Sequence, residues 1–147
     1  MAQFKFILRS SLMLPSKKNE TMMYNLLAGW IGMAAGVLSG AAIGLFFHRD
    51  KWLGGYSSFE RRMLRLGHIA FFGIGFLNIL FALTLGEAQL GHWALAGSWA
   101  LAATNLLMPL NCFLSAWKKA FRHLFCIPVL GASWGVATAI IHILNTL

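Results

Sequence analysis

Residues 28–48 read AGWIGMAAGVLSGAAIGLFFH, and small side chains recur in this stretch at every fourth position. In water, each interior glycine would cost a helix about 0.5–1 kcal/mol relative to alanine. In a bilayer, the missing side chains let a second helix approach closely, and packing replaces the hydrophobic driving force between helices. The spacing therefore predicts a membrane-spanning helix that presents a row of glycines to another helix. This glycine ridge consists of Gly32, Gly36, Gly40 and Gly44.

Apolar stretches of similar length fill most of the remaining chain. They lie near residues 24–47, 63–86, 90–114 and 124–145. Each holds about 20 residues or more, enough to cross roughly 30 Å of hydrocarbon at about 1.5 Å per residue. We therefore predict an all-α polytopic membrane protein in which residues 22–147 form a four-helix transmembrane bundle. Residues 1–21 are too charged to span the bilayer and are predicted to form a basic segment that is interfacial or disordered.

The charge distribution indicates contact with lipid head groups. Twelve Lys and Arg against four Asp and Glu give a formal net charge of +8. The basic residues lie at the ends of the apolar stretches, which argues against nucleic acid as a partner and favours membrane lipids. The links 48–65 and 115–123 hold eight of the twelve, so the positive-inside rule predicts cytoplasmic links and external termini. The expected location is a bacterial inner membrane, crossed several times.

Several polar and small side chains inside the apolar stretches are predicted to face other helices. Asn78, Ser98 and Asn105 form a polar seam along the second and third stretches. Gly131 and Gly135 repeat the spacing of four in the last stretch. Before the second stretch, residues 57–60 read SSFE and predict a capping box in which Ser57 caps the amide of Glu60.

The histidines are the ionisable residues nearest to the hydrocarbon region. Bis-imidazole ligation of a b-type haem needs two histidines at similar depth on different helices. His68 with His123, or His92 with His142, could satisfy that requirement. The alternative is that each imidazole hydrogen-bonds to backbone or head groups. His68 is the best placed for a role inside the bundle, because it lies about one turn within the second stretch on a line with Gly75.

Other chemistry has little support in the sequence. No Asp or Glu lies within the apolar stretches, which weakens a cation-coupled transporter and removes the paired acids of hydrolytic mechanisms. A metal site built from Cys112, His123 and Cys126 would lack a fourth ligand. We therefore predict no catalytic residues and no metal site.

A short segment resembles a known family of membrane enzymes. Residues 59–68, FERRMLRLGH, are similar to the entry to the second helix of the membrane-associated eicosanoid and glutathione metabolism proteins. Those are also basic four-span proteins of about this length, and the resemblance implies a glutathione-type membrane enzyme. The Asn and Glu that follow in that family are replaced here by Ile69 and apolar residues, so the polar partners of glutathione are missing.

The sequence favours a small membrane subunit or assembly factor of a larger bacterial inner-membrane complex. Its expected mode of action is glycine-mediated helix packing with other membrane subunits or with itself, since the glycine faces exceed what a four-helix monomer needs. One alternative is a b-type haem or quinone-site electron-transfer subunit that uses the membrane-edge histidines. A small channel or transporter, or the glutathione-type enzyme, is a further alternative.

Overall fold

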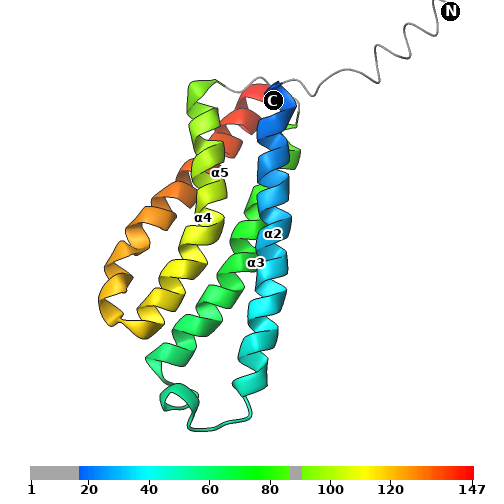
Figure 1. The fold of residues 1–147 in the computed structure, drawn as a ribbon. Helices are drawn as coiled ribbons and strands as arrows, with labels where there is room; N and C mark the ends of the chain where they lie inside the picture. Colours follow the sequence, from blue (N-terminus) through cyan, green and yellow to red (C-terminus); the bar gives the residue numbers. More distant parts are fainter. Residues whose placement is uncertain (1–16, 87–90) are drawn as a thin grey trace, which may run out of the picture.

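The computed structural model describes residues 17–86 and 91–147, and helices account for almost all of both ranges. They are α2 (Lys17–Phe46), η1 (Trp52–Gly54), α3 (Phe59–Leu85), α4 (His92–Trp117), η2 (Lys119–Phe125) and α5 (Cys126–Thr146), as Figure 1 shows. All four long helices are long and apolar enough to cross a membrane, which confirms the predicted all-α four-helix bundle. Because α2 begins at Lys17, it overlaps the predicted N-terminal segment 1–21, whose first 16 residues lie outside the described ranges.

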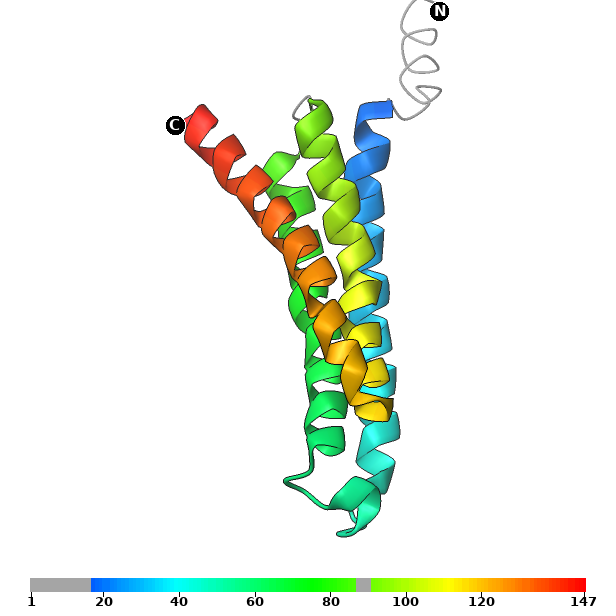
Figure 2. The same cartoon turned by 90° about the vertical axis from the view of Figure 1, so that its left-hand side faces the viewer.

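Short links make consecutive helices antiparallel neighbours (Figure 1). Helix α2 packs on α3, α3 on α4, and α4 on α5, while α2 also contacts α4. The links 47–58 and 118–125 lie at the same end of the bundle, which we call the basic end. Helix α5 is set apart, because it crosses the others obliquely and its C-terminal half leans away from α2 and α4 (Figure 2).

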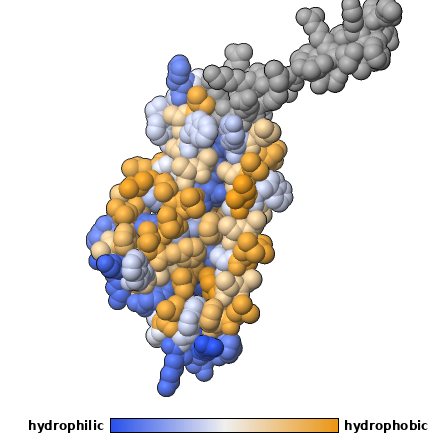
Figure 3. Space-filling view, viewed as in Figure 1, coloured by the Kyte–Doolittle hydropathy of each residue, from blue (hydrophilic) through white to orange (hydrophobic). Residues whose placement is uncertain are grey.

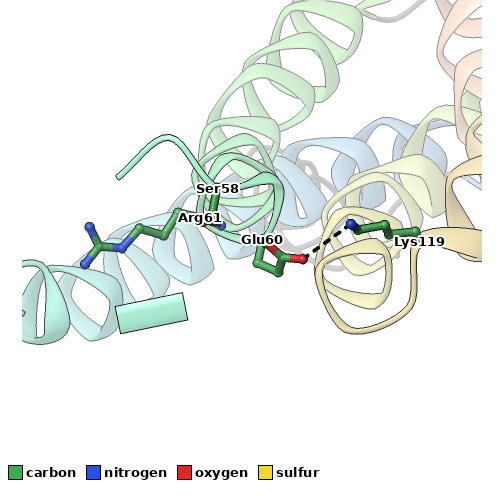
Figure 4. A network of polar contacts seen from close by, with 4 residues as sticks. All are labelled: Ser58, Glu60, Arg61 and Lys119. Atoms are coloured by element: carbon green, nitrogen blue, oxygen red, sulfur yellow. Dashed lines mark hydrogen bonds and ion pairs between the residues drawn. The ribbon is translucent and has the colours of Figure 1, made fainter. Parts of the chain in front are cut away.

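The start of α3 shows how local sequence fixes a helix end. Ser58 is the N-cap, with an extended backbone (φ −62°, ψ 151°), and its hydroxyl accepts a hydrogen bond from the amide of Arg61 at 3.2 Å. The predicted capping box on Ser57 is therefore wrong by one residue, since the residue directly before the first helical position supplies the cap. Glu60 points instead toward Lys119, 4.0 Å away, while Arg61 extends to the opposite side (Figure 4).

The bundle is apolar outside and partly polar inside. Many large apolar side chains of the long helices are exposed, whereas the most buried side chains include asparagine, serine and threonine. Hydrophobic residues cover much of the middle of the molecule in Figure 3, and hydrophilic residues gather at its lower end. This arrangement suits a lipid environment, in which polar groups gain from meeting one another away from the hydrocarbon.

Candidate functional site

The most buried polar cluster joins three helices. Asn25 of α2, Asn78 of α3 and Ser98 of α4 are all at most 1 % exposed. The amide nitrogen of Asn25 donates to Asn78 Oδ1 at 2.9 Å and to the backbone oxygen of Ser98 at 3.1 Å. The hydroxyl of Ser98 donates back to Asn25 Oδ1. Asn78 and Ser98 of the predicted seam are therefore linked by hydrogen bonds through Asn25. Asn25 is not among the residues predicted for the seam.

The amide of Asn78, the second in this cluster, also has a hydrogen-bond partner for each of its polar atoms. Asn78 Nδ2 donates to the backbone oxygens of Ile74 at 3.0 Å and of Leu101 at 3.2 Å. An uncharged amide whose donors and acceptor all have partners has no free atom for acid–base or ligand chemistry. The cluster can hold α2, α3 and α4 in register, because each broken bond would leave a polar group unpaired in a membrane interior.

The third seam residue, Asn105, is bound to the glycine ridge. Its amide nitrogen donates to the backbone oxygen of Ala28 at 2.5 Å. A Cβ added at Gly32 would collide with the Asn105 side chain, so glycine at this position admits the amide between α2 and α4. Asn105 Oδ1 is buried without a hydrogen-bond partner in the described part of the chain.

The rest of the ridge packs mainly on α3. A Cβ added at Gly36 would lie 2.7 Å from Phe72 Cε2, and one at Gly40 would collide with the ring of His68. Around Gly44, in contrast, nothing lies within 4 Å of such an atom. Three of the four ridge glycines therefore pack against side chains of this chain, and only Gly44 leaves open space that a partner could fill.

A further glycine, Gly29, lets α2 pack tightly against the backbone of α3. A Cβ at Gly29 would lie 2.7 Å from the backbone oxygen of Gly75 and 2.6 Å from Ile79 Cγ1. Gly29 was not included in the predicted ridge, because it lies three residues before Gly32 and outside the strict spacing of four. Positions three and four apart share a helix face, and this rule was the signal that could have found it.

The glycines of α5 mark its crossing with α4. A Cβ at Gly131 would collide with Thr104 Oγ1 and lie 3.1 Å from the backbone oxygen of Ala100. At Gly135 the same atom would lie 2.7 Å from Leu101 Cβ. The two glycines therefore set the contact from which the C-terminal half of α5 diverges.

His68 lies half-buried between α3 and α2. Its Nδ1 is 2.8 Å from the backbone oxygen of Gly36 and 3.4 Å from the hydroxyl of Ser39. The ring stands edge-on to Phe72, with centroids 5.3 Å apart. A proton on Nδ1 satisfies the contact with the carbonyl and leaves Nε2 as the basic nitrogen. His68 is therefore bonded to the backbone, and with its proton on Nδ1 the free Nε2 is the nitrogen that could bind a metal.

The other histidines do not share that setting. His123 is exposed in η2, which packs on α4 and α5, whereas His68 faces α2. The structure therefore does not bring the proposed pair His68 and His123 onto a common face. His92 is exposed at the start of α4. His142 is half-buried near the end of α5, in a groove of about 130 Å³ that Trp93 also lines, so these two histidines lie at the same end of the bundle.

In the segment similar to the glutathione enzymes, Arg61 is turned inward. Arg61 is 3 % exposed, and its Nη2 donates to the backbone oxygen of Arg49 at 2.5 Å. Its guanidinium lies over the rings of Phe47 and Trp52, 5.5 and 5.3 Å from their centroids. Arg61 thus joins the link after α2 to the start of α3.

Among the described residues, no three His, Cys, Asp or Glu side chains lie together in a way that could hold a metal ion. Cys112 is buried and Cys126 is exposed, and both are free thiols. In the comparisons with known proteins, no family model, no curated protein and no solved structure matches this chain.

Proposed function

We propose that the chain is a non-catalytic integral membrane subunit or assembly factor of a larger complex in a bacterial inner membrane. The observation that carries this proposal is the divergence of α5. Its C-terminal half leans away from the bundle (Figure 2) and leaves an apolar groove of about 130 Å³ against α3. Both sides of the groove are apolar, with Leu80 on α3 and Ile140 on α5.

The setting of this groove favours a protein helix as its occupant. It lies away from the basic end, beyond the crossing set by Gly131 and Gly135, and its lining on α3 and α5 is mainly apolar. Membrane helices associate by van der Waals packing of such surfaces. The polar seam supports the same function, because it fixes α2, α3 and α4 as a rigid platform beside α5.

The proposed orientation follows from the charged links. Arg49, Lys51, Arg62 and Arg65 lie at the same end as Lys118, Lys119 and Arg122. Under the positive-inside rule this end faces the cytoplasm, and the C-terminus of α5 lies on the opposite side.

The proposal is tested by the native mass of the protein. The tagged chain is extracted from its own membrane in a mild detergent, and the complex is weighed by native mass spectrometry. We expect a particle heavier than the 16.2 kDa chain with at least one different polytopic subunit. A particle that contains this chain alone, as a monomer or as an oligomer, contradicts the proposal.

A second candidate function is supported by the geometry of His68. We propose as the alternative that His68 would hold a b-type haem through Nε2, because Nδ1 is already held by the Gly36 carbonyl. The test is a reduced-minus-oxidised difference spectrum of the purified protein. The haem alternative predicts a Soret band that His68→Gln abolishes and that His48→Gln, at an exposed histidine, retains. A protein without this band, or a His68→Gln variant that keeps it, excludes the alternative.

A further inference from the structure

A second groove lies at the basic end, between α4 and the start of α5. It encloses about 110 Å³ and is lined by Leu107, Leu110 and Leu114 of α4 and by Leu124, Ile127 and Pro128 across from them. The side chain of Asn111 also borders it but is engaged elsewhere. In the orientation that satisfies both its atoms, this amide donates to the backbone oxygen of Phe121 at 2.9 Å and accepts from the amide of Phe125 at 3.0 Å. Because the Asn111 amide is already paired, the surface that the groove presents to a ligand is apolar.

Two cations and a tryptophan lie close in sequence to residues that line the groove. Leu114 lies four residues before Lys118, which is about 6 Å along a helix axis, and Leu124 lies two residues after Arg122. Trp117 is 76 % exposed, and Lys118 Nζ lies 5.5 Å from the centroid of its indole ring. An exposed tryptophan beside basic residues is typical of the membrane–water interface.

The charge near the groove is unbalanced. Lys119 pairs with Glu60 at 4.0 Å (Figure 4). Within the described ranges, Lys118 and Arg122 have no carboxylate partner, and both side chains are exposed. A mobile anion at the level of the head groups can therefore pair with these two cations, and phospholipid phosphates are concentrated there.

We propose that this groove binds one acyl chain of an anionic phospholipid whose phosphate pairs with Lys118 and Arg122. The apolar wall solvates the chain, and the two cations select the charge of the head group. From Leu107 to Leu114 the wall runs seven residues, about 10 Å of helix, so it covers the part of an acyl chain closest to the head group. The groove between α3 and α5, where we propose that another subunit binds, lies away from the basic end. The described residues that line it include no basic side chain that would select a negatively charged head group. The lipid site therefore stands independently of the proposed subunit role.

The experiment compares lipids of different charge and the same acyl chains. Purified protein is placed in nanodiscs of phosphatidylcholine that contain a minor fraction of phosphatidylglycerol. After transfer to detergent, the lipid that stays bound is counted by native mass spectrometry. We expect retained phosphatidylglycerol and no retained phosphatidylcholine. Each of Lys118→Gln and Arg122→Gln should weaken retention by about fivefold, while Lys51→Gln at the same end should not.

A groove-filling variant separates a bound lipid from a general surface effect. Leu110 is 43 % exposed, so the indole of Leu110→Trp can fill the groove without entering the core. Leu106→Trp is the matched control, because Leu106 lies nearby on α4 and is 63 % exposed. We expect Leu110→Trp to weaken retention by about tenfold or more, the worth of a few buried methylenes, at an unchanged melting temperature. Equal retention by the Leu110 and Leu106 variants, or equal retention of both lipids by the unmodified protein, overturns the proposal.

Discussion

At the scale of single residues, buried amides hold the helices together. Asn25 and Asn78 lie on different helices and are joined by a 2.9 Å hydrogen bond, with both side chains fully enclosed. Removing one partner leaves the other unpaired, which costs about 1–3 kcal/mol for a buried polar group. We expect Asn25→Ala and Asn78→Ala each to lower stability by such an amount, whereas Asn145→Ala, at an exposed position, should have little effect.

A double-mutant cycle measures the pair itself. The Asn25→Ala, Asn78→Ala double variant should lose less than the sum of the single losses, with a coupling energy of about 0.6–1.7 kcal/mol. Reversible unfolding in mixed micelles supplies the four stabilities. Strict additivity would mean that the two amides do not interact and that the seam has no part in holding α2 against α3.

Only part of this site could be predicted from the sequence. Asn78, Ser98 and Asn105 stand out because each interrupts an apolar stretch. Asn25 lies beside Tyr24 at the very start of its stretch, where a polar residue is expected to face head groups. What decides its role is that α2 begins at Lys17, so that Asn25 already lies on a helix packed against α3 and α4.

At the scale of helices, Gly36 and Gly44 of the ridge can be compared directly, because only Gly36 packs against another helix. An added methyl at Gly36 meets the ring of Phe72, while the same methyl at Gly44 meets nothing within 4 Å. We expect Gly36→Ala to cost about 1–3 kcal/mol, because overpacking forces α2 and α3 apart. Gly44→Ala should be neutral or stabilising by up to about 1 kcal/mol, since alanine is the better helix former.

Thermal unfolding of both variants in the same detergent checks this prediction. Equal melting temperatures for Gly36→Ala and Gly44→Ala would show that the ridge faces lipid along its whole length. The regular spacing of four alone could not separate the two positions. The distinction arises because α2 and α3 part near the basic end, where the link 47–58 and its turn at Gly54 and Gly55 (φ 80° and 94°) intervene.

The number and order of the helices follow from hydropathy, but the path of the link that carries His123 does not. Apolar stretches of about 20 residues are determined by composition and were found close to their observed bounds. The placement of His123 depends on η2, a seven-residue 3-10 helix whose path is set by contacts such as those of Asn111. Periodicity carries no information about such a link, so the sequence alone could not predict that η2 packs on α4 and α5.

At the scale of the whole molecule, orientation in the membrane is a direct prediction. Ser57→Cys lies at the basic end and Gly91→Cys at the opposite end, and both positions are exposed. In a background with Cys112 and Cys126 replaced by alanine, a membrane-impermeant thiol reagent should label Gly91→Cys in intact cells. It should label Ser57→Cys only in inverted vesicles. The reverse pattern would mean that the basic residues of segment 1–21 govern insertion.

The central claim is that the open side of α5 receives a helix from another subunit, and cross-linking in intact membranes tests it most directly. A photoactivatable residue replaces Ile140 in the groove or, as the control, Leu38 on the lipid-facing side of α2, which is 71 % exposed. We expect Ile140 to form an adduct with a transmembrane segment of one different protein, identified by mass spectrometry, and Leu38 to react with lipid. Adducts of Ile140 with lipid alone, or only with a second copy of this chain, would contradict it.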